Sequence, residues 1–418
     1  MNHLHHIFSA SMLFLIARWL FFWLVTLFLP PLLLGIIGQT KARFEGRSGA
    51  TVLQPFFDLI KLMRKGETLS RSTSWVFRST AAVNFAVVLL IAILTPWLSF
   101  KPVVYEQFRA TDLVAQKIKS NRTSAESGEL GAANVRPEMP GQFHNDSSQT
   151  PQDSGDKQLA VHSMNINGMS LYSTEPEPVA QPTASPSLPY DTMFSDHATT
   201  GSDLFLIIYM FALARLFTVL AALDGGSVFG GFGASREVTI ALLVEPAIIL
   251  ALASLGCAAQ TSDLNAIFVW LHGDSLINSP SLWFFAGMSL ILASLGELSR
   301  MPVDDPSTKL ELTMVHEAMV IENSGRNLAL VQYTQLLKMT VLLGLAGQCF
   351  LHGAAWFIEI SGPTKDLLSL AVIAVLAFAI ACTESLTVKL RWTKVPEFIA
   401  YSVAMSLLCA LIAIGGHR

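Results

Sequence analysis

Of six ionisable residues that stand out in or beside apolar stretches of this sequence, four are our candidates for holding and passing a proton. Three are the carboxylates Glu237, Glu245 and Glu297, and the fourth is the amine of Lys338. A charge at membrane depth is costly, so such residues indicate a function and a nearby partner. Glu237 and Glu245 are about 12 Å apart along a helix axis and within about 80° around it. We predict that the four residues form a proton path or transmit a coupling signal. The ionisable residues found in apolar runs are Arg215, Glu237, Glu245, Glu297, Lys338 and Glu384.

A structural alternative applies most directly to Glu237. If the helix begins near Val238, this carboxylate lies at the helix start, where the helix dipole favours it. Glu245 lies deeper and precedes Pro246, so that explanation is weaker for it. The segment Gly225–Glu237, GGSVFGGFGASRE, lacks the Gly-Lys-Ser/Thr of a phosphate-binding loop. Its glycines indicate close backbone approach or unusual dihedral angles beside a cavity.

The most charge-rich segment of the otherwise apolar second half runs from residue 296 to residue 326. Within it, Asp305 precedes Pro306, a pair typical of a helix start. A charged loop is ordinarily a solvated surface, and the functional alternative is a dock for a redox partner. The candidate docking residues are Arg300, Asp304, Asp305, Glu311, His316 and Glu317.

The sequence offers no metal-binding pattern. His316 and Glu317 match the start of an H-E-x-x-H zinc site, but Val320 replaces the second histidine. The cysteines lie in or at the ends of apolar runs with no C-x-x-C spacing, whereas iron–sulfur clusters need closely spaced thiolates. We therefore expect neither a metal nor a redox centre on this chain, and no catalytic residue. The cysteines are Cys257, Cys349, Cys382 and Cys409.

The elements that must position these residues are membrane helices. The chain of 418 residues is 52% hydrophobic and 14% charged, whereas soluble domains are roughly 25% charged. Eight apolar runs approach or exceed the ~20 residues of a spanning helix. Because no Lys or Arg precedes the first run, we interpret it as a span rather than a cleaved signal peptide. The runs are Ile7–Ile37, Ala81–Phe100, Asp203–Leu223, Val238–Ala258, Ser281–Leu298, Asn327–His352, Asp366–Leu386 and Phe398–Ile414.

Basic residues concentrate in the odd-numbered loops, so these loops are expected on the cytoplasmic side and both termini outside. The second loop, residues 101–202, is rich in proline and serine and has a net charge of −5. Such a segment buries too little apolar surface to fold, so we predict a disordered external insertion. A folded partner-binding domain is the alternative. The chain thus divides into residues 1–100, the insertion, and a six-helix region over residues 203–418.

One amphipathic helix is predicted between the first two spans. In Gln54–Lys65, Phe56, Leu59, Ile60 and Met63 recur with helical spacing, and polar residues lie opposite. This pattern is typical of a helix in the membrane interface. The fold class is therefore all-α and integral to the membrane, with about eight spans, this interfacial helix and the insertion.

Three segments resemble the complex I subunit 1 family. They are KARFEGRSGATVLQPFFDLIKLMRK, GGSVFGGFGASREVTIALLVEP and GELSRMPVDDPSTKLELTMVHEAMVIENSGRNLAL. Within that family they are most similar to the membrane subunits of group 4 NiFe hydrogenases of the formate hydrogenlyase and hydrogenase 4 type. The similarity covers nearly the whole chain outside the insertion.

The resemblance implies a non-catalytic subunit in a bacterial or archaeal cell membrane that couples electron transfer to proton translocation. Its cytoplasmic loops would dock hydrogenase large and small subunits and ferredoxin-like iron–sulfur proteins, beside antiporter-like membrane subunits. The NiFe and iron–sulfur centres would lie on those partners. RMPVDDPSTKL at Arg300–Leu310 lacks the Glu-Ala-Glu usual in complex I members, which weighs against quinone. A quinone-site subunit of an NADH dehydrogenase and a passive membrane anchor remain the alternatives.

Overall fold

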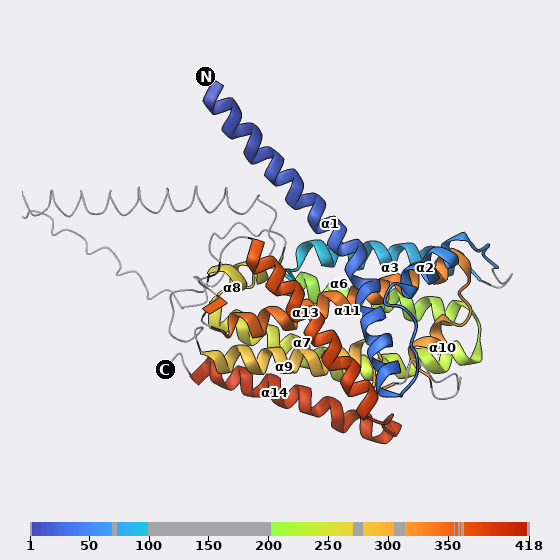
Figure 1. Cartoon of the computed structure of the whole chain (residues 1–418). Coiled ribbons are helices and arrows are strands. Elements are labelled where there is room, and N and C mark those ends of the chain that lie inside the picture. Colours follow the sequence, from blue (N-terminus) through green and yellow to red (C-terminus); the bar gives the residue numbers. More distant parts are fainter. Residues whose placement is uncertain are drawn as a thin grey trace, which may run out of the picture. The chain divides into compact units, whose positions relative to one another are not determined.

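The computed structural model describes residues 2–68, 73–98, 202–270, 279–304, 314–354, 356–357, 360 and 363–415. In these ranges the chain is helical, with one isolated bridge between Asp203 and Asp263 and no strand (Figure 1). Apart from Ser202, the predicted insertion lies outside the described residues. The helices are α1 (Asn2–Phe44), α2 (Gln54–Arg64), α3 (Trp75–Leu94), α6 (Leu204–Asp224), α7 (Val228–Ala259), α8 (Leu264–Trp270), α9 (Pro280–Glu297), α10 (His316–Val320), α11 (Gly325–His352), α13 (Pro363–Leu386) and α14 (Val395–Gly415).

Eight of these helices are long and apolar enough to cross a membrane, as the sequence predicts. Two of them, α3 and α7, begin six or more residues earlier than expected, and a serine caps each one. Ser74 Oγ accepts a hydrogen bond from the amide of Val76 at 3.1 Å, so α3 begins at Trp75 rather than at Ala81. Such a cap pairs an amide that the first turn otherwise leaves without a partner.

The second early start concerns α7. Ser227 Oγ accepts from the amide of Gly230 at 3.3 Å, and the helix begins at Val228 rather than Val238. Most of the glycine-rich segment is therefore helical and not irregular. Its glycines serve close approach instead, because a Cβ on Gly233 would lie 2.8 Å from the carbonyl oxygen of Val315.

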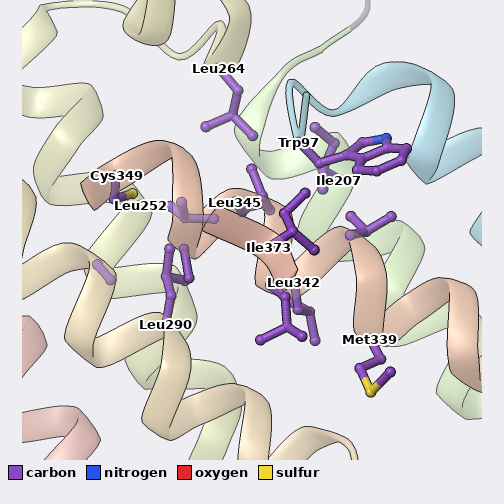
Figure 2. Packing of buried hydrophobic residues seen from close by; sticks show 14 of the residues in the cluster. Trp97, Ile207, Leu252, Leu264, Leu290, Met339, Leu342, Leu345, Cys349 and Ile373 are labelled. Carbon is purple, nitrogen blue, oxygen red and sulfur yellow. The ribbon is translucent and has the colours of Figure 1, made fainter. Parts of the chain in front are cut away.

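The core of the bundle is built around α11, which packs against α1, α2, α3, α9 and α13. Met339, Leu342, Leu345 and Cys349 of α11 point into the main apolar cluster (Figure 2). Gly344 allows the chain after α3 to approach, since a Cβ there would lie 2.7 Å from Trp97 Cβ. Small residues at helix contacts are the usual means of packing helices closely in membranes.

On the other side of α9, small residues bring α7 and α14 close. Ser289 of α9 and Ser402 of α14 each donate a hydroxyl hydrogen bond to the other's carbonyl oxygen, at 3.0 and 2.9 Å. A Cβ on Gly296 would lie only 2.7 Å from Val244 Cγ2 of α7. This tight contact fixes the position of the next residue, Glu297, at the end of α9.

Candidate functional site

Glu297 is the centre of a buried charge cluster. Its side chain is about 3% exposed, and Lys338 Nζ of α11 lies 2.5 Å from Oε1. Arg215 of α6 donates hydrogen bonds to both carboxylate oxygens from Nη2. One carboxylate therefore joins two cations from two different helices, as expected for a charge that has been removed from water.

Arg215 extends the cluster to α7, because its Nη1 donates to Glu245 Oε1. The guanidinium thus links carboxylates on α7 and α9. Its buried Nε has no hydrogen-bond partner among the described residues. Of the three carboxylates, Glu245 is the most accessible, with 36% of its side chain exposed.

Glu237 is the third carboxylate of the cluster; it is buried, like Glu297, and lies about two turns before Glu245 on α7. Because α7 begins at Val228, Glu237 is in the third helical turn, so the helix-start explanation does not apply. Its Oε2 accepts from Ser299 Oγ at 3.3 Å. Ser299 occupies the left-handed region, with φ 47°, in the turn that ends α9. Glu297, Lys338 and Arg215 all act electrostatically on Glu237.

These five groups comprise three carboxylates and two cations. If all were ionised they would carry a net charge of −1, and a buried group without a counter-charge is costly. Uptake of one proton by a carboxylate would balance the charge. The arrangement is therefore suited to holding one proton and to moving it when the cations shift. The five residues are Arg215, Glu237, Glu245, Glu297 and Lys338.

A second pair of contacts holds the segment that follows α9 to the end of α13 and to the residues just after it. Arg300 Nη1 lies 3.1 Å from Glu384 Oε1 at the end of α13, and its Nη2 lies 3.6 Å from Met339 Sδ. Asp304 receives Lys389 Nζ at 2.6 Å and the amide of Val315 at 2.9 Å. Arg300 and Asp304 are thus engaged inside the protein, whereas the sequence prediction placed both among the docking charges.

His316 lies between the two groups of charges, at the start of α10. Its burial, followed by the positive charges of Lys338 and Arg300, lowers the pKa of His316 from 6.5 to about 4, so the imidazole is neutral at pH 7. Desolvation and nearby Asp304 raise the pKa of Glu317, and Arg300 opposes that rise. Asp305 and Glu311, the remaining predicted docking residues, lie outside the described residues.

The tertiary structure adds three residues to the predicted site. Arg215 and Glu384 already stand out in the sequence as ionisable groups in apolar runs, but their partners come from distant helices. In the sequence, Lys389 stands out only as one of the basic residues of the odd-numbered loops, which indicate the orientation of the chain in the membrane. In the part of the chain that the structure describes, no group of three His, Cys, Asp or Glu residues could hold a metal.

Comparisons with known proteins agree with this architecture. The NADH dehydrogenase family model matches residues 179–415. Formate hydrogenlyase subunit 4 of Escherichia coli (strain K12) is 23% identical over 93% of this chain and 97% of its own length. Hydrogenase-4 component C of the same strain is 37% identical over 151 residues, 36% of this chain and 46% of that protein.

A solved structure supports the fold along almost the whole chain. A chain of the membrane-bound sulfane sulfur reductase (MBS), an archaeal respiratory membrane complex, superposes with a TM-score of 0.58 at 15% identity. The match covers 96% of this chain and 99% of that one. At this identity the similarity concerns the fold alone.

Proposed function

Because this chain belongs to the NADH dehydrogenase family, the complex I subunit 1-like membrane proteins, we propose that it couples electron transfer in a NiFe hydrogenase complex to proton translocation. It is a multi-pass membrane protein related to the membrane subunits of hydrogenase and complex I-like respiratory complexes. The proposal assigns the NiFe and iron–sulfur centres to hydrogenase and ferredoxin-like partner subunits, with antiporter-like subunits alongside. The proposal also places both termini and the insertion on the external side of the cell membrane.

The observation that carries this proposal is the sharing of Glu297 by Lys338 and Arg215. Such a carboxylate gains or loses proton affinity whenever either cation moves, since an opposite charge within ~4–6 Å favours the ionised form. Glu245 and Glu237 can then receive or supply the proton. A passive anchor would have no need for two buried carboxylates and a half-buried third one around two cations.

The coupling signal would reach this cluster through α10. His316 is acted on by Lys338 of the cluster and by Arg300 of the loop contacts. A redox subunit that docks on the loop around His316 and Glu317 and shifts α10 would alter the field at Lys338. The strength of the Lys338–Glu297 ion pair would then change. The proton affinity of Glu297 would change with it, and the proton would move.

The central prediction concerns Glu297 and Glu245. Glu→Gln keeps the shape of the side chain and removes its titratable charge, so proton translocation per electron should fall severalfold in the complex that assembles. The measurement is proton uptake into vesicles holding the purified complex, divided by the hydrogen evolved. Glu397→Gln, at an exposed pair with Lys394, is the matched control. An unchanged ratio in both cluster variants would contradict the coupling role.

The same purification separates the hydrogenase proposal from the quinone-site alternative. A mild-detergent preparation should contain a nickel-bearing subunit and evolve hydrogen. A nickel-free complex that reduces quinone, and that quinone-site inhibitors block, would favour the NADH dehydrogenase alternative. Because Asp304 is held by Lys389, charge reversal at Asp304 would disrupt the loop itself, so Glu317→Lys is the better test of docking.

A further inference from the structure

The outer face of α2 carries a second surface that the coupling proposal does not use. The predicted apolar stripe of this helix is divided in the structure. Phe56 and Leu59 turn toward the protein, where the rings of Phe28 and Phe56 lie 5.4 Å apart and Leu59 packs against the core. Ile60 and Met63 of the same stripe are about half exposed. The helix therefore has apolar surface left over after its contacts with the bundle.

Two further large side chains join the exposed strip. Leu53 and Phe57 are 52% and 60% exposed. With Ile60 and Met63 they fall within about 120° around the helix at 100° per residue, a sector that overlaps the inward-packing side at Phe56. We call this set, Leu53, Phe57, Ile60 and Met63, the α2 outer strip.

Three cations border the α2 outer strip. Lys61, Arg64 and Lys65 are exposed, and none of them forms an ion pair among the described residues. The one acidic residue of α2 is Asp58, whose Oδ1 receives Gln54 Nε2 at 2.9 Å. From Lys41 to Lys65 the chain has six basic and two acidic residues, a net charge of +4. The surface beside the strip thus attracts anions.

The position of α2 in the chain places it at the headgroup level of the bilayer. The span α1 ends at Phe44 and the span α3 begins at Trp75, so the connection between them stays at one membrane face. At 11 residues, α2 is roughly 16 Å long, too short to cross a ~30 Å hydrocarbon layer. It must therefore lie near the boundary between water and acyl chains.

We propose that the α2 outer strip and Lys61, Arg64 and Lys65 form a binding site for anionic phospholipids. The strip would enter the acyl boundary while the three cations reach the phosphates of the headgroups, which is how basic amphipathic helices bind anionic membranes. Charge complementarity selects an anionic lipid over a zwitterionic one. The membrane, rather than an acidic protein, is the occupant because the cations adjoin an uncovered apolar strip at headgroup level.

The test uses the full chain in nanodiscs of equal phosphatidylglycerol and phosphatidylcholine, followed by native mass spectrometry of the retained lipids. The wild-type chain should retain phosphatidylglycerol preferentially. Each Lys or Arg near an anionic surface contributes about fivefold to attraction. Replacing Lys61, Arg64 and Lys65 with Gln should therefore lower the phosphatidylglycerol enrichment several-fold. Arg47→Gln, at a cation that pairs with Glu45, is the matched control and should retain the enrichment.

A charge-preserving variant and a set of contradicting outcomes complete the test. Lys61→Arg with Lys65→Arg preserves every charge and should retain the enrichment, which guards against a fold defect in the triple variant. Equal retention of both lipids by the wild-type chain, or undiminished enrichment in a folded triple variant, would overturn the proposal. So would a triple variant that keeps its lipids in nanodiscs and loses a peripheral subunit when the whole complex is purified, because the site would then be a protein dock.

Discussion

At the scale of single residues, the distribution of buried charge decides what the site can do. Glu297 is paired with both Arg215 and Lys338, so loss of either cation leaves this buried carboxylate with one counter-charge instead of two, and loss of Arg215 also leaves Glu245 without its partner. Breaking a buried pair in this way costs roughly 3–5 kcal/mol, far more than an exposed pair contributes. A buried carboxylate that loses a counter-charge takes up a proton rather than remain ionised. Coupling requires this property.

A prediction at this scale concerns His316 and pH. Its pKa in the folded chain is about 4, against an ordinary value of 6.5. Below pH 6.5 the unfolded chain therefore binds a proton that the folded chain rejects, because burial first, and then the charges of Lys338 and Arg300, disfavour the charged imidazole. The contribution of neutral His316 to stability is complete above pH 6.5 and is lost as the pH falls toward 4.

The measurement is the thermal unfolding midpoint in detergent at pH 7.5 and pH 5. The drop on acidification should be smaller in His316→Gln than in the wild-type chain, since glutamine does not titrate. Glu317 has a raised pKa and acts in the opposite direction, but it is present in both proteins and cancels in the comparison. Equal drops in both proteins would show that His316 does not exclude a proton.

At the scale of helices, close approach at small residues sets the geometry that the charges need. The contact of Gly344 in α11 with Trp97 brings the chain after α3 against the helix that carries Lys338. Trp97 is fully buried, and its Nε1 donates to the carbonyl oxygen of Ala92 at 2.8 Å. The contact between Gly344 and Trp97 therefore leaves no space for an additional methyl group.

We therefore expect Gly344→Ala to destabilise the bundle by about 1–3 kcal/mol, the usual cost of overpacking a filled core. The reason is the added Cβ, which would lie 2.7 Å from Trp97 Cβ and 2.8 Å from its carbonyl oxygen. Gly38→Ala in α1 is the matched control, because a Cβ there meets nothing within 4 Å. Denaturant titration of the two variants in detergent measures the difference. If the Gly344 variant is as stable as the control, the chain around Trp97 can move away from α11 at little cost, and the prediction is wrong.

At the scale of the whole molecule, eight membrane crossings would put both ends of the chain on one side of the membrane, as the sequence predicts. The positive-inside argument assigns that side to the exterior and places the first loop in the cytoplasm. The same assignment puts α2 and α10 at the cytoplasmic end of the bundle, where redox partners would dock. Figure 1 shows α2 and α10 at one end of the helices and α8 at the other.

The orientation can be tested by cysteine labelling. The sequence contains four cysteines, so a background without them is needed. A cysteine at Gly128 should react with a membrane-impermeant thiol reagent on intact cells, and one at the exposed Ser48 should not. Ser48 is preferable to Gly46, whose φ of 68° disfavours a side chain. Labelling at Ser48 alone would reverse the assigned topology.

The sequence by itself determined the eight spans, the amphipathic α2 and the set of buried ionisable residues, because each is a local property of composition or period. It misjudged the start of α7, since the cap at Ser227 outweighs the helix-breaking tendency of the following glycines. Only the tertiary structure decided that Arg215 joins Glu245 to Glu297 and that Asp304 meets Lys389, residues 85 positions apart. Ion pairing depends on distance in space, and in a helix bundle that distance is set by packing between helices far apart in the chain.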